Sequence, residues 1–276
     1  MAANRFLVKA PRPQIHSAVD YSVGTLAGPL SVRLYRPSSQ PGLPIILFVH
    51  GGGFIFGNLE THDAMARELA NRTNAVIVTV DYRLAPEYPF PAALDDCISA
   101  LDWVITEAAA LTVDSTRISL AGDSAGGQLA VATALRCSGS GPRLRHVALL
   151  YPLLDPHRAS PSARALAEGY MLTGSFIEWA WSAYSGSPEM PDSPLFDVEH
   201  AVLDNFPPTT IVTGQFDPLR DEGEAFFARL ERAGVPVELK CYDGMIHGFA
   251  GFPDLTPVAN EAIDFLAQRL ASSFAG

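Results

Sequence analysis

The sequence is poor in cysteine, with three residues in 276 and no C-x-x-C spacing. A disulfide framework or a zinc knuckle is therefore not expected, and Cys97, Cys137 and Cys241 are predicted to be small buried hydrophobic residues in a reducing compartment. Positive charge is also scarce, because 19 Lys and Arg residues face 30 Asp and Glu residues, for a formal net charge of −11. A field of that sign repels nucleic acid and anionic lipid, so we expect neither as a partner.

Long hydrophobic runs are absent as well. No apolar run reaches the 18 residues that a membrane-spanning helix requires, and no membrane association is predicted. The first residues, MAANRFLVKAPRPQ, lack the apolar core of a signal peptide, and with the cysteine usage they predict a cytoplasmic location. The sequence leaves the oligomeric state open, a homodimer included.

The chain does contain short, evenly spaced apolar segments that alternate with helical patterns. The predicted strands are a hairpin at 18–27 and 30–36, followed by buried runs at 44–49, 75–80, 117–121, 146–151, 209–213 and 235–242. Helical periodicity covers 92–109, 125–136, 221–233 and 256–270. This alternation predicts one α/β domain over residues 1–276, with a mostly parallel eight-stranded sheet flanked by helices on both faces.

Residues 155–206 interrupt the alternation, since they contain two helical patterns and no buried strand. The segment is too long for an ordinary loop. It is predicted to be a helical cap inserted over the C-terminal edge of the sheet, where open α/β folds bind ligands. Trp179, Trp181 and Tyr184 within it either line a pocket or form the packed face of an amphipathic helix, and the sequence leaves both readings open.

The motif GDSAGG, residues 122–127, lies between a predicted strand and a predicted helix. This context turns G-x-S-x-G from a common pattern into a specific one, because it places Ser124 on a tight, strained turn with its hydroxyl above the sheet. Gly122 and Gly126 keep neighbouring segments from colliding with that turn. Ser124 is therefore the predicted nucleophile.

A serine nucleophile needs a base, and in this strand–turn–helix arrangement the acid and the histidine follow the serine in the chain. His247 lies in the loop after the last predicted strand, at the same edge of the sheet as Ser124. Three other histidines after Ser124 open a strand or lie in or beside the insertion: His146, His157 and His200. His247 is the predicted base.

The acid is expected at the end of the preceding strand, where TTIVTGQFDPLRDE offers two aspartates. Asp217 follows the strand directly and is the predicted triad acid. Asp221 is positioned to cap the following helix, which is its ordinary role, and is kept as an alternative acid.

HGGGF, residues 50–54, follows another buried strand. Acyl transfer passes through an oxyanion, which backbone N–H groups stabilise, and glycines let such a backbone approach the substrate. One donor is expected from Ala125 at a helix N-terminus and others from the glycine loop. His50 is predicted to hold that loop, and Asp123 to accept loop N–H groups. In DYRLAPE, residues 81–87, the polar side chains are predicted to form a buried network without chemistry.

HGGGF, DYRLAPEYPFPAALDD, GDSAGG, YPLLDP, DPLRDE and HGF together resemble the hormone-sensitive-lipase-like carboxylesterases of the α/β-hydrolase fold, from about residue 18 to the end. The resemblance implies Ser124, His247 and Asp217 as the triad and the N–H groups of Gly52, Gly53 and Ala125 as the oxyanion hole. It also implies hydrolysis of short-chain acyl esters through an acyl-enzyme, with a small-molecule ester as substrate and no metal or cofactor.

Two features depart from this family. Gln128 stands where the family has Asn after GDSAGG, and only about 17 residues precede the first strand pattern, so the N-terminal arm is expected to be largely absent. Three alternatives remain. The same triad could cleave an amide, lactone or formamide; the chain could be a non-catalytic binding protein of this fold; or it could be a lipase acting at an oil surface.

Overall fold

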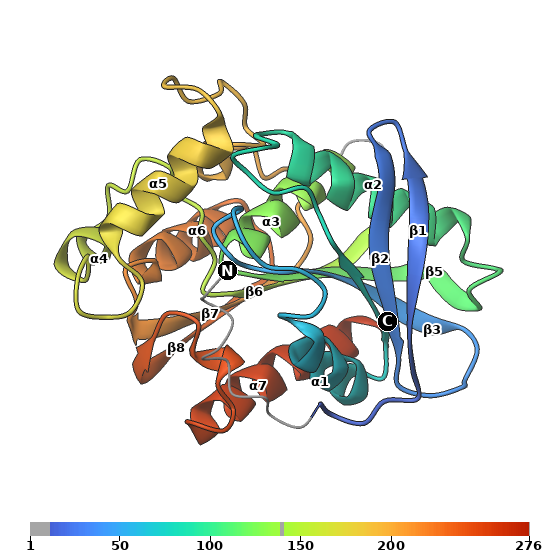
Figure 1. Ribbon diagram of the computed structural model, residues 1–276. Helices are drawn as coiled ribbons and strands as arrows, with labels where there is room; N and C mark the ends of the chain where they lie inside the picture. Colours follow the sequence, from blue (N-terminus) through green and yellow to red (C-terminus); the bar gives the residue numbers. More distant parts are fainter. Residues whose placement is uncertain (1–11, 139–140, 276) are drawn as a thin grey trace.

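The computed structural model describes residues 12–138 and 141–275 and has an eight-stranded sheet at its centre (Figure 1). The strand order is β1-β2-β4-β3-β5-β6-β7-β8, with β1–β2 and β2–β4 antiparallel and the remaining pairs parallel. The strands are β1 (Ser17–Thr25), β2 (Gly28–Arg36), β3 (Leu43–Val49), β4 (Val76–Val80), β5 (Val113–Asp123), β6 (Leu144–Leu150), β7 (Thr209–Phe216) and β8 (Val237–Ile246). The predicted mostly parallel sheet is confirmed.

Helices cover both faces of the sheet. The helices are α1 (Asp63–Thr73), α2 (Ala92–Thr106), α3 (Ala125–Cys137), α6 (Arg220–Arg232) and α7 (Pro257–Ser273). Side chains of α2, α3 and α6 share one buried cluster with the sheet, and α1 and α7 share a second cluster on the opposite face. Each of these helices therefore buries one apolar stripe against the strands.

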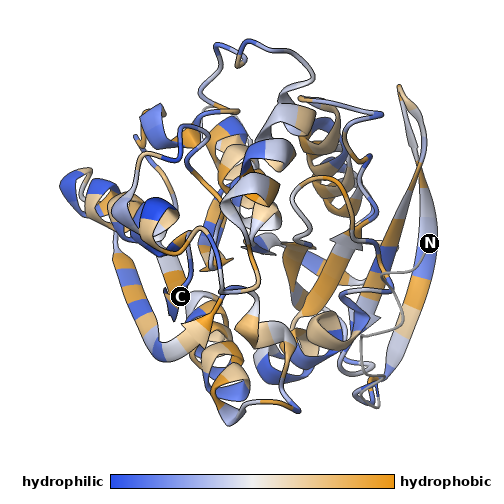
Figure 2. Cartoon of the chain, turned by 60° about the vertical axis from the view of Figure 1, so that its left-hand side comes forward, coloured by the Kyte–Doolittle hydropathy of each residue, from blue (hydrophilic) through white to orange (hydrophobic). Residues whose placement is uncertain are grey.

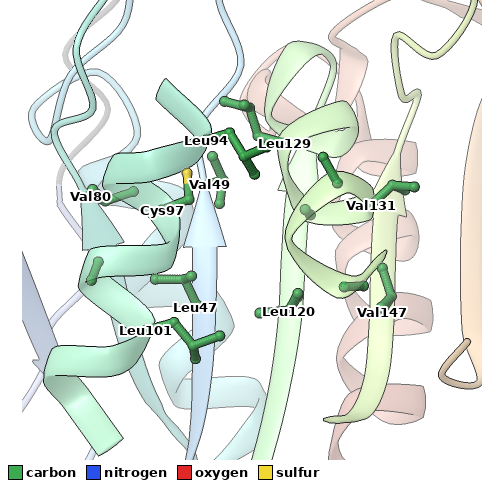
Figure 3. Close-up of a cluster of buried hydrophobic side chains, with 14 of the residues drawn as sticks. Leu47, Val49, Val80, Leu94, Cys97, Leu101, Leu120, Leu129, Val131 and Val147 are labelled. Carbon is green, nitrogen blue, oxygen red and sulfur yellow. The ribbon is translucent and has the colours of Figure 1, made fainter. Parts of the chain in front are cut away.

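The central strands are buried on both faces, as their continuous apolar sequences predict. All seven residues of β3 are buried, and Figure 2 shows the central strands mostly in the hydrophobic colour, whereas the helices alternate between polar and apolar residues. In Figure 3, Leu94, Cys97 and Leu101 of α2 lie against Leu47 and Val49 of β3. Cys97 is thus a core residue, while Cys137 and Cys241 are only half-buried, and all three are free thiols.

One helix was not expected from the sequence. Helix α1 was not predicted, because its buried face consists mainly of small or polar residues (Asp63, Ala66, Ala70 and Thr73 around Leu69) and offers few large apolar side chains to mark a helix. The predicted signal-peptide absence and short N-terminal arm concern residues 1–11, which lie outside the described residues. Among the described residues, no helix combines the length and the apolar character needed to cross a membrane.

The segment 155–206 contains α4 (Pro161–Ala165), α5 (Gly174–Ser185) and the 3-10 turn η2 (Val198–His200), and no strand. Thr173 begins α5 by accepting a hydrogen bond from Phe176 N–H through its side chain, and Gly186 ends it in the left-handed conformation. A further 3-10 turn, η3 (Phe249–Gly251), follows β8.

A titratable side chain lies inside the sheet. His146 of β6 is buried, and its Nε2 is 2.8 Å from the hydroxyl oxygen of Thr210 on β7. Burial lowers the pKa of His146 to about 4, despite the opposing charge of Glu238. The folded protein therefore keeps this imidazole neutral at pH values where an unfolded chain, with an ordinary pKa near 6.5, binds a proton.

Acidification from pH 7 to pH 5 is thus expected to destabilise the fold, because the unfolded state takes up a proton that folded His146 refuses. This one group accounts for about 2 kcal/mol over that interval. His146→Gln should remove that part of the pH dependence, measured by urea unfolding at both pH values. The exposed His16→Gln serves as the control. An unchanged pH dependence in His146→Gln would contradict the assignment.

Candidate active site

Ser124 lies on the turn between β5 and α3 in a strained backbone conformation, with φ 52° and ψ −122°. Hydrogen bonds hold the turn on both sides: Ser124 N–H donates to Leu150 O at 2.9 Å, and the Ser124 carbonyl accepts from Gly127 N–H at 2.9 Å and Leu153 N–H at 3.0 Å. Because the neighbouring strand overdetermines the turn, the strained conformation persists.

Gly126 makes this turn sterically feasible. A Cβ on Gly126 would lie 2.1 Å from the carbonyl oxygen of Val49 and 2.6 Å from that of His50, both backbone atoms of the strand end beside it. Only glycine allows α3 to begin this close to the end of β3. The turn and the glycine loop are therefore packed backbone against backbone.

Ser124, His247 and Asp217 form a continuous hydrogen-bonded chain. His247 Nε2 is 3.0 Å from Ser124 Oγ, and His247 Nδ1 is 2.8 Å from Asp217 Oδ2. Since a carboxylate only accepts, the neutral imidazole carries its proton on Nδ1, and Nε2 is left to accept the proton of the serine hydroxyl. Asp217 is fully buried, and His247 and Ser124 are 8% and 9% exposed, so bulk water is largely excluded from this chain.

The two aspartates after β7 have different partners. Asp217 also accepts a hydrogen bond from Leu219 N–H at 2.8 Å through Oδ1, which fixes its carboxylate toward His247. Asp221 does not contact His247 in the structure, and the capping role predicted for it is wrong. It lies in the first turn of α6 and accepts a hydrogen bond from Ser162 N–H of α4 at 2.7 Å.

One contact of the His247 ring was not predicted from the sequence. Tyr151, directly after β6, packs edge-on against His247 with ring centroids 4.9 Å apart. Tyr151 is itself in the left-handed region at φ 36°. Its position at a strand end, in the YPLLDP motif, was the signal that could have marked it as a residue that orients the base.

The glycine loop turns its backbone in a way that only glycine adopts readily, with φ 122° at Gly52 and 60° at Gly53. Across residues 12–138 and 141–275, the N–H groups of Gly52, Gly53 and Ala125 have no hydrogen-bond acceptor. Gly53 and Ala125 are buried and Gly52 is half-buried. Because buried N–H groups are nearly always paired, these unpaired donors beside a strained serine indicate a binding site for an acceptor.

A buried carboxylate ties the glycine loop to the serine turn. Asp123 Oδ1 accepts the Gly51 N–H at 2.8 Å, as predicted, and lies 3.4 Å from Nε2 of His62. Burial by itself raises the pKa of Asp123, but the charge and hydrogen bond of His62 and the bond from Gly51 together lower it below its ordinary value. A charged Asp123 therefore anchors the loop beside the nucleophile.

His50 has a structural environment. Its ring stacks on Tyr82 at 4.2 Å between centroids, its Nδ1 donates to Gly51 O at 2.8 Å, and burial lowers its pKa to about 4. Tyr82 in turn donates its hydroxyl to His50 O at 2.9 Å.

The DYRLAPE network, residues 81–87, is only partly buried. Arg83 pairs with Asp96, but Asp81 and Glu87 are exposed, contrary to the prediction.

The insertion contacts both loops of the site. A Cβ on Gly53 would lie 3.0 Å from ring atoms of Phe176 in α5, and a Cβ on Gly248, next to His247, would lie 3.6 Å from Met171 Cε. Gln128 of α3 is buried and donates to Leu195 O at 2.9 Å and Phe196 O at 3.1 Å, so the residue that departs from the family pattern binds the insertion to the body.

The sequence left open whether the aromatic residues of α5 line a pocket or form the packed face of an amphipathic helix, and they differ in this respect. Trp181 and Tyr184 are buried and pack with Phe54 and Phe196, as the face of an amphipathic helix does. Trp179 is 51% exposed and meets Phe176 edge-on at 5.9 Å.

In the part of the chain that the structure describes, no group of candidate metal ligands includes Ser124, Asp217 or His247. Among the described residues, the one group of three His, Cys, Asp or Glu side chains close enough to share an ion is remote from the triad in sequence, within the insertion. A cavity of about 850 Å³ lies at the opposite edge of the sheet, around the start of β6 and the end of α7, and contains none of the triad residues.

A strained serine beside unpaired N–H groups, on the C-terminal edge of a mostly parallel sheet, defines the class of α/β-hydrolases. The sequence model of the family described as alpha/beta hydrolase fold matches residues 46–251. The chain belongs to this family, within its hormone-sensitive-lipase-like group.

Known relatives extend over most of the chain. Esterase LipI of Mycobacterium tuberculosis is 36% identical over 95% of this chain and 84% of its own length. Carboxylesterase NlhH of the same species is 39% identical over 84% of this chain and 75% of its own length. The structure of a hyperthermophilic esterase from the archaeon Pyrobaculum calidifontis superposes with a TM-score of 0.91 at 38% identity, covering 95% of this chain and 85% of that one.

The close backbone contact at Gly126 predicts that adding a single methyl group there strongly destabilises the fold. Gly126→Ala should lower the free energy of unfolding by about 1–3 kcal/mol or more, because the colliding atoms are backbone and cannot rotate away. Gly24→Ala in β1, where a Cβ meets nothing within 4 Å, is the matched control and should change stability by less than about 0.5 kcal/mol. Urea unfolding measures both; equal stabilities would contradict the packing described.

Proposed function

We propose that this protein is a serine carboxylesterase that hydrolyses short-chain acyl esters through an acyl-enzyme intermediate. The observation that carries the proposal is the hydrogen-bonded chain of Ser124, His247 and Asp217 beside the unpaired N–H groups of Gly52, Gly53 and Ala125. In this proposal residues 1–276 form one domain, and residues 155–206 form a cap inserted into it.

The reaction follows from these positions. Ser124 Oγ attacks the ester carbonyl while His247 Nε2 takes its proton, and the buried carboxylate of Asp217 stabilises the imidazolium. The N–H groups of Gly52, Gly53 and Ala125 bind the oxyanion, with the N-terminus of α3 adding a favourable dipole. His247 then protonates the leaving alcohol, and in the second half it activates the water that releases the acid.

The alternatives have less support. A binding protein has no need for an aligned proton-transfer chain or for three unpaired donors next to it, so the non-catalytic reading is disfavoured. The triad can attack any acyl carbon, but the relatives are named esterase and carboxylesterase, which favours the ester bond over the amide, lactone or formamide.

Three aromatic rings beside the glycine loop indicate which acyl group the site prefers. They are called the aromatic row: Phe56, Phe176 and Trp179. Neighbouring rings are 6.0 Å and 5.9 Å apart, and Phe56 and Trp179 are 56% and 51% exposed. Exposed apolar side chains next to unpaired oxyanion donors favour an apolar acyl group. A wall of three rings supports burial of only a few methylenes, hence acyl groups of roughly two to six carbons.

The triad predicts how activity responds to substitution. Ser124→Ala should lower kcat by about 10⁴–10⁶ and abolish covalent labelling by a fluorophosphonate. Asp217→Asn should lower kcat by about 10³–10⁴, because the amide no longer holds the Nδ1–H tautomer of His247. Nitrophenyl acetate hydrolysis and intact-protein mass spectrometry measure the two effects.

Asp221→Asn is the matched control for Asp217→Asn, since it removes one carboxylate four residues further on, in the first turn of α6, where Asp221 contacts Ser162 instead of His247. It should retain kcat within a few-fold. A Ser124→Ala variant with a tenth of the parent rate, or exchanged effects of the two Asn variants, would overturn the assignment.

The aromatic row predicts a chain-length profile. From two to six carbons, each CH₂ should raise kcat/KM by up to about fourfold, which corresponds to about 0.8 kcal/mol, and longer chains should add little. Phe176→Ala should flatten this rise, whereas Val202→Ala, an exposed residue elsewhere in the insertion, should not. Preference for twelve carbons or more, or activity only above the solubility limit, would favour a lipase instead.

A further inference from the structure

Three side chains from the two ends of the insertion converge, and none of them belongs to the proposed catalytic triad. His157 Nε2 lies 3.2 Å from Asp197 Oδ2, and His200 Nδ1 lies 2.8 Å from the same oxygen. All three ligand-type atoms are within 4.8 Å of one another. Residue 157 comes just after β6, and residues 197 and 200 come near the return to β7, so the cluster links segments about 40 residues apart in the chain.

The backbone on each side of the cluster is fixed. Asp155 accepts the His157 N–H at 2.7 Å and donates its own N–H to the buried Glu222 of α6 at 2.6 Å. On the other side, Arg229 of α6 donates to the carbonyl oxygens of Val198 and Ala201, which frame η2. Both halves of the cluster are thus attached to the same helix, α6. The three side chains therefore meet on segments that other hydrogen bonds already hold in place.

The three donor atoms and their spacing suit a divalent cation of intermediate softness, such as Zn²⁺. Two imidazole nitrogens and a carboxylate oxygen are ligands that Zn²⁺ prefers. With metal–ligand distances of about 2.0–2.1 Å, tetrahedral ligands lie about 3.3 Å apart. The two contacts to Asp197 Oδ2 are already near that separation. The second oxygen, Asp197 Oδ1, is buried and has no hydrogen-bond partner among the described residues, so the carboxylate has unused acceptor capacity.

Access and charge also favour a cation. The side chains of His157 and His200 are 52% and 70% exposed, so an ion can reach their nitrogens from solvent. The formal net charge of the chain is −11, which raises the local concentration of cations.

We infer that His157, Asp197 and His200 bind one Zn²⁺-type ion that joins the two ends of the insertion. The site is independent of the proposed esterase function, because no triad or oxyanion residue belongs to it. Bound metal favours the folded state over the unfolded chain and restrains the insertion at its base, with a remaining coordination position facing solvent.

Titration of the chelator-treated protein with ZnCl₂ in a calorimeter tests this inference. One Zn²⁺ per chain is expected, and His157→Gln, His200→Gln and Asp197→Asn should each weaken the Kd at least tenfold. At about a hundredfold excess of Zn²⁺ over its Kd, the Tm should rise by about 5 °C. Zn²⁺ should also slow proteolysis within residues 155–206 of the parent protein, and not of His200→Gln.

His16→Gln and Cys137→Ser are the controls, since each removes a Zn²⁺ ligand type outside the cluster and should leave the Kd unchanged. The two His variants alter exposed side chains, so their metal-free Tm should stay near that of the parent, which separates lost binding from misfolding. Absence of stoichiometric binding, or equal Kd values in the parent and the cluster variants, would overturn the inference.

Discussion

Backbone packing at the end of β5 holds the reactive groups of this protein together. The turn at Ser124 is strained, and it persists because hydrogen bonds from Gly127 and Leu153 close on its carbonyl and because Gly126 lets α3 begin against the end of β3. The contact with β3 brings the glycine loop beside the serine, and the bond from Gly51 to Asp123 locks the loop there. The proposed nucleophile and the proposed oxyanion donors are therefore positioned by a single junction between two strands.

The parallel sheet explains why residues up to 123 positions apart meet at that junction. The C-terminal ends of β5, β7 and β8 lie at one edge, and they deliver Ser124, Asp217 and His247 in that order along the chain. Burial then gives the alignment its strength, since a fully buried Asp217 and a nearly buried His247 interact in a low-dielectric environment with their orientation already fixed by Leu219 N–H and by the Tyr151 ring.

The segment 155–206 contacts both the glycine loop and helix α3. Helix α5 brings Phe176 against the glycine loop, and Gln128 fastens the insertion to α3 from below. Its two ends meet at His157, Asp197 and His200, over α6, the helix that follows Asp217. The aromatic row and the His157–Asp197–His200 cluster thus belong largely to one segment, and the cluster shares no residue with the proposed triad.

The sequence by itself determined the mostly parallel sheet, the strand–turn–helix setting of Ser124 and the placement of His247 and Asp217 at strand ends, because strand burial and turn chemistry are local and periodic. Helix α1 was missed because few large apolar side chains mark its buried face. Only the tertiary structure decided that Asp221 faces α4, that Tyr151 packs on the imidazole, and that Trp179 is exposed while Trp181 is buried. These contacts join residues far apart in the chain, and which side chains meet across such distances depends on how the strands and the insertion pack, which no local pattern encodes.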